Sequence, residues 1–330
     1  MKINATTFND FVKLGEVKWR RGFSDVPMLA KQLYDVRSSN EETSEHSSLD
    51  GFTFARRLTE SDNYFVETPT QNYSKTMTKY RVGLMATISW RMRKYDKYRE
   101  MDRVLSGLGE AAARKMDLDL THRFTFATAV SYVDQDGVTV TTTVGDGLAL
   151  LSTAHTVNGS STTYRNRVAN NPAFSRSGLE AAEKLFATQM IDSSGKQVIS
   201  EPDTIVTSND PAVINTVREF LNSTASLAVS NPGVVNVYAH KYKHLVLPRL
   251  ATTNTGAHDS SKLSLWFLAN TAHTDALCEI SEMPHMVSPS AGSNAEEFDN
   301  DDWSFKASAA YGIEITDPKW IVGSTGDSTA

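Results

Sequence analysis

Residues 51–89 constrain the fold more than any other part of the sequence, because apolar or aromatic residues alternate there with polar ones. Alternation with a period of two places successive side chains on opposite faces of a β-strand. Residues 67–72, which read ETPTQN, interrupt the pattern and are typical of a turn. We therefore expect a long β-hairpin over residues 51–88. Because an isolated two-stranded hairpin is only marginally stable in water, it needs a further surface to pack against.

A long amphipathic helix is expected next, over residues 91–126. At 1.5 Å per residue it would be roughly 50 Å long. Gly107 and Gly109 lie in its middle and each costs about 1 kcal/mol relative to alanine, so we expect a weak point where the helix can kink. The apolar residues that define the helix recur at steps of three and four; they are Met101, Val104, Leu105, Leu108, Ala112, Met116, Leu120 and Phe124.

Two shorter helices have clear start signals. Ser177 and Glu180 form a capping box, and Asp210 is an N-cap followed by Pro211 in the first turn. Helices grouped with sheets indicate an α+β fold. The expected strands are a hairpin over 130–144 that turns at 136–137, a short strand within 201–210, and strands at 234–239, 244–247, 263–268, 304–310, 313–315 and 320–322.

The first 49 residues look like an arm. Residues 8–34 mix single aromatic residues with charges and are expected to hold a short helix, whereas residues 38–48, SSNEETSEHSS, form a polar tract expected to be a linker. Residues 1–11 lack the apolar stretch of a signal peptide, so no secretion route is expected. The longest apolar runs, such as 265–269, are far shorter than the roughly 20 residues that span a bilayer, so no membrane contact is expected either.

Charge is distributed unevenly along a chain whose net charge is -6. Residues 75–103 hold nine Lys or Arg and three acids, whereas residues 275–303 hold eight acids and no Lys or Arg. Either these are two solvated faces of a monomer, or one region meets the other across a subunit contact, where complementary charge sets register. A dedicated nucleic-acid binder would be more basic. The single cysteine, Cys278, excludes internal disulfides and is expected to be a packing residue.

Residues 146–159 bring together Asp146, Ser152 and His155, the residue types of a nucleophilic triad. Ser152 lacks the flanking glycines of a nucleophile elbow, which would expose its hydroxyl beside backbone donors. We expect a turn at residues 146–147, a short buried strand over residues 148–151 and then a loop. A serine hydrolase that uses Ser152, His155 and Asp146 remains the alternative from another functional class, although triads are recognised by geometry.

No motif for a metal or a cofactor is complete. His240 and His244 are four residues apart, but the surrounding valines favour strands and no third ligand is placed. Residues 296–302, EEFDNDD, lack the glycine and the final glutamate of a calcium loop and predict an acidic loop. We expect no cofactor, no metal and no catalytic residue.

Four segments, taken in order, carry a resemblance to a known family; they are 146–156, 174–196, 201–223 and 319–324. Together with the arm, hairpin and long helix, they resemble the major capsid proteins of tailed bacteriophages, which have the Hong Kong 97-like (Johnson) fold. Within that family the pattern is similar to the major head subunits of Mu-like phages. The segment holding Asp146, Ser152 and His155 is then structural, with no enzymatic activity implied.

The resemblance implies a division into domains. Residues 1–49 would be the N-terminal arm and residues 50–88 the extension loop, a β-hairpin. The peripheral domain would comprise residues 89–174 and 286–330, with the spine helix at about 91–126. The axial domain would comprise residues 175–285.

The same resemblance implies a virion protein. Hexamers and pentamers of the chain, assembled in the host bacterial cytoplasm, would form the icosahedral head around a double-stranded DNA genome. Implied partners are a portal protein, a separate scaffold and a decoration protein, with only nonspecific contact to the packaged DNA. An encapsulin-like nanocompartment shell, which would hold cargo enzymes, is the alternative with the same fold.

A subunit interface is expected where the hairpin and the two charge runs lie. Lys75 and Lys79 also lie where a lysine that donates to an intersubunit isopeptide crosslink could be. The expected interface residues are Tyr64, Phe65, Tyr73, Lys75, Lys79, Arg81, Glu296, Glu297, Asp299, Asp301 and Asp302.

Overall fold

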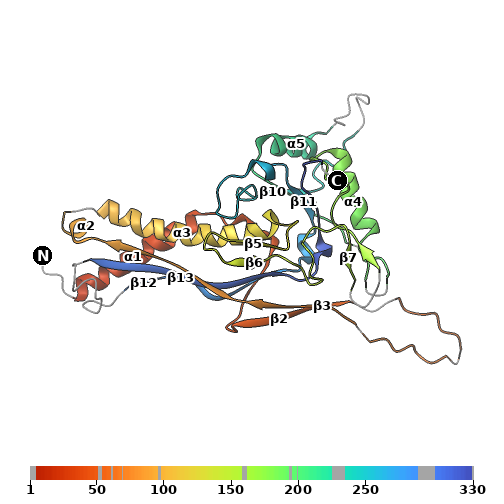
Figure 1. Ribbon diagram of the computed structural model, residues 1–330, viewed down its shortest axis with the longest axis horizontal. Helices are drawn as coiled ribbons and strands as arrows, with labels where there is room; N and C mark the ends of the chain where they lie inside the picture. Colours follow the sequence, from red (N-terminus) through yellow and green to blue (C-terminus); the bar gives the residue numbers. More distant parts are fainter. Residues whose placement is uncertain are drawn as a thin grey trace.

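The protein is an elongated mixture of helices and sheets, as a computed structural model shows (Figure 1). A long flat part carries the N-terminal helix at one end, and a compact body rises from its other half. A loop projects beyond that body (Figure 1). The structure describes residues 5–50, 54–60, 62–68, 70–95, 98–157, 162–192, 195–198, 200–224, 235–288 and 302–328.

Two long helices lie along the flat part. α1 (Ala5–Asp25) packs against α3 (Tyr98–Thr125), and the short α2 (Trp90–Lys94) precedes α3. The expected single helix over 91–126 is therefore wrong at its start, because the chain turns at Tyr95. α3 continues unbroken through Gly107 and Gly109. The expected short helix in the arm is in fact 21 residues long.

The glycine in the middle of α3 serves close packing. A Cβ at Gly109 would lie 2.3 Å from the backbone oxygen of Trp19, and a Cβ at Gly22 would lie 2.1 Å from that of Ser106. Only residues without a Cβ let the two backbones approach so closely. The helix-weakening residue that we expected to permit a kink thus fixes the crossing of α1 and α3.

A four-stranded sheet runs beneath α3. Its strand order is β1-β12-β13-β4, with β1 parallel to β12 and the other neighbours antiparallel. The apolar face of this sheet, including Phe305 and Ile88, packs with Leu105 and Leu108 of α3. The strands are β1 (Asp35–Ser38), β4 (Tyr80–Ile88), β12 (Ala276–Val287) and β13 (Trp303–Ile315), so two expected strands, 304–310 and 313–315, are one.

The projecting β-ribbon is formed by other segments of the chain than the expected hairpin. β2 (Thr43–Asp50) pairs antiparallel with β3 (Thr70–Thr78), and the loop between them is the part that projects. Residues 70–72, expected in a turn, belong to β3, and β4 joins the long sheet. The linker expected at 38–48 is wrong, because polar Ser44 is buried there and donates to Glu279 Oε2 at 2.6 Å. This polar strand was mistaken for a linker because Glu279, which accepts from the buried Ser44, lies 235 positions further along the chain.

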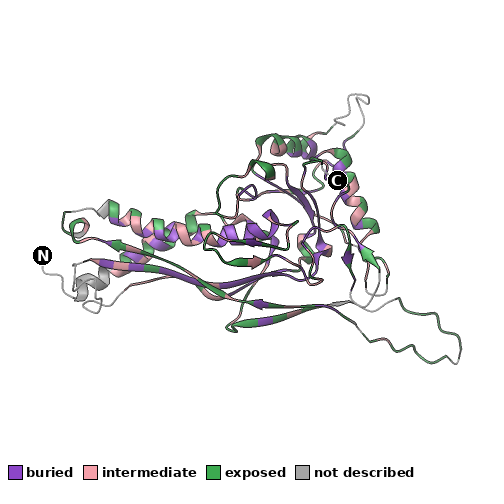
Figure 2. Cartoon of the chain, in the orientation of Figure 1, coloured by how far each residue is buried: buried purple, intermediate pink, exposed green. Residues whose placement is uncertain are grey.

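A second four-stranded sheet forms the centre of the compact body, in the order β10-β9-β11-β14. Both faces are buried, since Ile205 and Trp266 face α4 and α5 while Val206 and Phe267 face the carboxyl end of α3. Figure 2 shows this buried centre in purple. The elements are α4 (Arg176–Thr188), β9 (Thr204–Thr207), α5 (Pro211–Asn222), β10 (Lys243–Val246), β11 (Trp266–Ala269) and β14 (Ile321–Ser324).

One of the two predicted helix starts is confirmed. Asp210 caps α5 as expected, whereas α4 begins two residues early, with Ser175 in place of Ser177 accepting from the Gly178 amide. The predicted hairpin is confirmed as β5 (Ser131–Val133) and β6 (Thr139–Thr141). The strand expected at 234–239 is wrong: residues 237–240 form turns, and residue 234 lies outside the described residues.

The remaining pieces are short. Residues 148–151 are mostly buried, but they bend instead of forming the expected strand, and only Ala149 bridges to Thr143. The other elements are β7 (His155–Thr156), β8 (Thr163–Tyr164) and the 3-10 helices η1 (Leu29–Leu33), η2 (Ser260–Lys262), η3 (Thr271–His273) and η4 (Pro318–Trp320).

Candidate assembly surface and the cluster around His155

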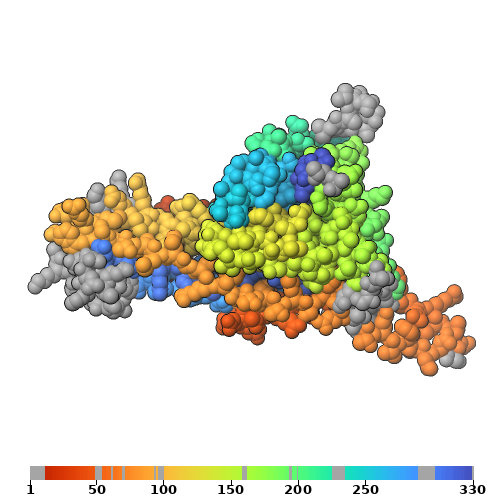
Figure 3. Space-filling view, viewed as in Figure 1, coloured from red at the N-terminus to blue at the C-terminus, as the bar shows by residue number. Residues whose placement is uncertain are grey.

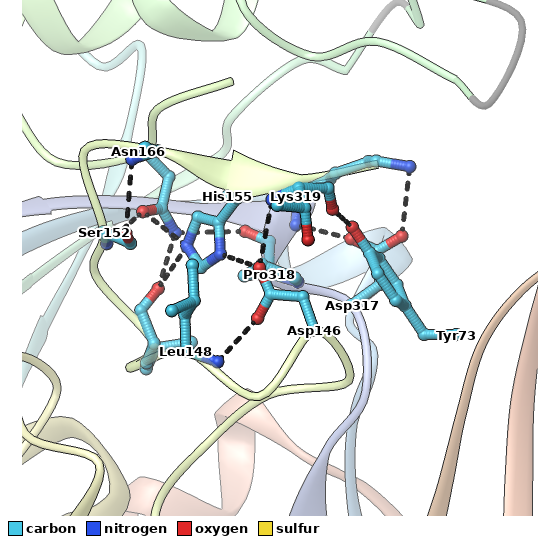
Figure 4. Close-up of polar contacts among 12 residues, drawn as sticks. Tyr73, Asp146, Leu148, Ser152, His155, Asn166, Asp317, Pro318 and Lys319 are labelled. Atoms are coloured by element: carbon cyan, nitrogen blue, oxygen red, sulfur yellow. Dashed lines mark hydrogen bonds and ion pairs between the residues drawn. The ribbon is translucent and has the colours of Figure 1, made fainter. Parts of the chain in front are cut away.

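The triad-like residues form a buried cluster (Figure 4). Asp146 Oδ2 lies 2.7 Å from His155 Nδ1, and both side chains are inaccessible to solvent. Asp146 Oδ1 also accepts from the Leu148 amide at 2.9 Å, which closes the turn that the sequence predicted. Burial acts to raise the pKa of Asp146, but the hydrogen bonds and charge of His155 outweigh it and lower that pKa below 3.8.

Ser152 is not placed as a nucleophile. His155 Nε2 lies 3.1 Å from Asn166 Oδ1 and 3.3 Å from Leu150 O, and Asn166 Oδ1 also accepts from the Ser152 amide at 2.9 Å. The Ser152 hydroxyl accepts from the Ala154 amide. Among the residues that the structure describes, no hydrogen bond joins that hydroxyl to His155. A base that activates serine must make this contact, so the geometry does not support the hydrolase alternative.

The cluster instead ties the base of the β2–β3 ribbon to the body (Figure 4). The Tyr73 hydroxyl, from β3, donates to the backbone oxygen of Thr156, next to His155. Asn72 Nδ2 donates to Asp317 Oδ2 at 3.2 Å, and Lys319 Nζ pairs with the same oxygen at 3.2 Å. Three segments that are distant in sequence therefore meet at the point where the ribbon leaves the body.

Two expected interface lysines are used within their own chain. The side chain of Lys79, only 3% exposed, pairs with Glu279 Oε2 at 2.9 Å and also donates to Ser39, Glu41 and Ser44. Lys75 pairs with Glu314 of β13 and donates to a backbone oxygen. These contacts leave both ammonium groups enclosed by their own subunit.

Part of the charge complementarity is also intramolecular. Arg81 Nε donates to Ser308 Oγ at 2.8 Å and lies 3.8 Å from Glu282. Asp302 accepts from the Trp90 amide at 3.0 Å. The basic and acidic runs thus meet within one chain at two pairs, Lys79 with Glu279 and Arg81 with Glu282. The remaining predicted interface acids, Glu296, Glu297, Asp299 and Asp301, lie outside the described residues.

The projecting loop carries exposed apolar side chains. Tyr64 is 84% exposed, Phe65 54% and Val66 86%. Figure 3 shows the loop, in orange, standing clear of the body. Clustered exposed apolar side chains mark interaction sites. Tyr64 and Phe65 were among the predicted interface residues, whereas Val66, Phe54 and Leu58 were not, although the same alternation could have identified them.

The histidine pair does not resemble a metal site. His244 Nε2 lies 2.9 Å from Thr207 Oγ1, and burial lowers the pKa of His244 to about 4. Within the described ranges, no group of three His, Cys, Asp or Glu could hold a metal ion. In the same ranges, no helix is long and apolar enough to cross a bilayer.

An elongated subunit whose exposed loop carries clustered apolar side chains has the features of a protein that binds other subunits through its surface. The profile of a phage capsid protein family matches residues 73–324. The chain belongs to this family and is a structural major capsid protein that forms the shell of a phage head.

The chain is also similar to several solved structures. A chain of Gordonia phage Cozz is 10% identical with a TM-score of 0.50, covering 90% of this chain and 85% of that one. The capsid of cyanophage P-SCSP1u is 11% identical with a TM-score of 0.50, covering 88% and 85%. A virus-like particle from Pyrococcus furiosus is 11% identical with a TM-score of 0.48, covering 94% and 97%. A search of curated protein sequences found no match.

Proposed function

We propose that this chain is the major head subunit of a tailed phage, with the Hong Kong 97-like fold and on the Mu-like branch. Hexamers and pentamers of it form an icosahedral head around double-stranded DNA. The exposed apolar loop of residues 54–60 and 62–68 is the observation that carries this proposal, because covering side chains such as Tyr64 and Val66 with another surface lowers the free energy. The family match supports it independently.

The domain division is proposed with two adjustments. Residues 1–42 are the arm and 43–79 the extension loop, in place of 1–49 and 50–88, because β2 pairs with β3 whereas β4 joins the long sheet. Residues 80–174 and 276–330 are the peripheral domain and 175–275 the axial domain. β12 begins at Ala276 and pairs along β13, so we move the end of the axial domain to residue 275. α3 is the spine helix, although it begins at Tyr98.

We further propose that the chain has no enzymatic activity and binds no cofactor. The enclosed hydrogen bonds of His155 support this, since they leave no activated serine. The protein resides in the virion after assembly in the bacterial cytoplasm. Its partners are its own copies, a portal, a scaffold and a decoration protein. Because the net charge is -6, the chain offers little positive charge to DNA phosphates, and we expect its contact with packaged DNA to be nonspecific.

Purified recombinant chain tests the proposal. Sedimentation velocity and negative-stain microscopy should show rings or closed shells, whereas a persistent 36.4 kDa monomer under all assembly conditions would contradict it. The contents of particles isolated from lysed host cells distinguish a phage head from a nanocompartment shell. Double-stranded DNA inside them supports a phage head, and enzyme cargo without DNA supports the nanocompartment.

A further inference from the structure

A pocket of about 260 Å³ opens between α5 and β10, which lie close together in the compact body (Figure 1). Its polar lining includes Arg218 and Asn222 of α5, His240 of the turn before β10, and His244 of β10 itself. None of the described residues that line the pocket is acidic. In a chain whose net charge is -6, the pocket is therefore a local concentration of hydrogen-bond donors and positive charge.

The charge of Arg218 is not neutralised inside the subunit. Arg218 is exposed, and no carboxylate in the described ranges forms an ion pair with it. Its charge acts on His244 instead: burial and, after it, the neighbouring guanidinium lower the pKa of His244 to about 4. The guanidinium and the imidazole thus lie close enough to interact through the pocket. An anion placed between them would be attracted to Arg218 and would offset its repulsion of a protonated His244.

Both imidazoles have a nitrogen available to a ligand. His244 Nε2 lies 2.9 Å from Thr207 Oγ1. When that hydroxyl donates to Nε2, the ring proton is on Nδ1, for which the described part of the chain offers no acceptor. His240 has a φ of 57°, which is uncommon for a residue with a side chain, and its amide donates to Leu221 O at 3.0 Å. This hydrogen bond holds His240 against the last turn of α5.

We propose that this pocket binds a phosphate group. The planar fork of Arg218 contacts two of its oxygens, and the Asn222 amide and the imidazoles of His240 and His244 donate to the others. A tetrahedral phosphate has more acceptor oxygens than a carboxylate, so it can use all four groups. At about 30 Å³ for each water molecule, the pocket has room for roughly eight waters, which is enough for a phosphate and part of its hydration shell. The site is separate from the projecting loop.

Inorganic phosphate is the probe that tests the site. The full chain is unfolded thermally in increasing sodium phosphate and, for comparison, in sodium chloride of the same ionic strength. A ligand that binds only the folded chain raises its melting temperature, so phosphate should raise it above the chloride value. In Arg218→Gln the fitted dissociation constant should rise at least about tenfold, because the charged hydrogen bonds are lost. Broadening of the phosphate ³¹P NMR line measures the same binding without unfolding.

Arg176→Gln is the matched control. Arg176 is an exposed arginine of α4, in the same compact body, and its Nε lies 2.9 Å from Glu180 Oε1. The variant removes an equal charge outside the pocket and should leave the phosphate affinity unchanged within about twofold. His240→Ala keeps the charge of Arg218 but removes one donor, and it should weaken binding several-fold. This second variant distinguishes a built site from general attraction to a cation.

The phosphate group can be a free ion or part of a nucleic acid, and a short single-stranded DNA titrated in the same way identifies the source. Stabilisation by DNA that Arg218→Gln abolishes would assign the site to a nucleic-acid phosphate. Stabilisation by inorganic phosphate alone would assign it to the free ion. Either result supports the pocket as a phosphate site.

A melting temperature that depends only on ionic strength would overturn the proposal. So would an equal loss of phosphate affinity in Arg218→Gln and Arg176→Gln. Neither outcome bears on shell formation, which is tested separately by the assembly of the unmodified chain.

Discussion

Asp146 and His155 form a buried pair whose hydrogen bonds hold the turn at the base of the ribbon. Removing one charged member of such a pair costs about 3–5 kcal/mol. Asp146→Asn should therefore lower the unfolding free energy of the unassembled subunit by about 3 kcal/mol at pH 7, as measured by urea denaturation. The folded-state pKa of Asp146 lies below 3.8, so its stabilisation is complete above pH 3.8 and is lost as the pH falls further.

Ser152→Ala is the matched control for that variant. Its hydroxyl accepts only a local amide hydrogen bond from Ala154, so the unfolding free energy should change by less than about 0.5 kcal/mol. An equal loss in the two variants, or an Asp146→Asn deficit that persists undiminished at pH 3, would contradict the role assigned to the pair.

His122 gives a second pH dependence. Burial, together with the charges of Lys115, Lys262 and Arg249, lowers the pKa of His122 to about 4. The unfolded chain then binds a proton that the folded chain does not, so the unfolding free energy should fall as the pH drops from 6.5 to 4. His122→Gln should remove about 2–3 kcal/mol of that fall. Denaturant titrations across this range measure it, and an unchanged slope in the variant would contradict the assignment.

Single residues were predictable where their chemistry is local. Asp210 caps α5 as the sequence indicated, because an N-cap needs only neighbours two or three positions away. Lys79 was not predictable in this way, since its partners are Glu279 and Ser44, which adjacent strands bring to it. A buried lysine looks the same in sequence as an exposed one. The prediction that Lys79 lies in a subunit interface rested on the charge pattern of the sequence alone.

At the scale of elements, the crossing of α1 and α3 depends on a glycine. Gly109→Ala should destabilise the subunit by more than about 2 kcal/mol, because the new Cβ would lie 2.3 Å from the Trp19 oxygen. Gly107→Ala meets nothing within 4 Å and should stabilise it by up to about 1 kcal/mol, since alanine favours a helix. Thermal unfolding of both variants measures the contrast. Shifts of the same sign would refute the close crossing.

Strongly periodic elements were predicted better than pairings. The pattern of α3 and the β5–β6 hairpin is local, and both are present. β12 was missed because its alternation is weak and its burial comes from β13 and β1 on either side. The ribbon was misplaced for a related reason: β2 is polar in sequence, and only its pairing with β3 makes it a strand.

At the scale of the whole molecule, substitutions at the loop tip should impair assembly without affecting the folding of the subunit. Tyr64, Phe65 and Val66 are exposed, so replacing all three with serine should leave the melting temperature of the subunit unchanged within a few degrees. Shell formation should fall at least tenfold, because the apolar area available to a neighbouring copy is lost. Light scattering during assembly measures this. Normal assembly of the triple variant would contradict a role for the tip.

The central claim is that the exposed loop of residues 54–60 and 62–68 is covered by a neighbouring copy in a shell. Cryo-electron microscopy of assembled particles tests it most directly, at a resolution that shows side chains. We predict that Tyr64 and Val66 of every subunit are buried against an adjacent subunit. A shell in which these side chains face solvent, or lie against their own subunit, would contradict the account.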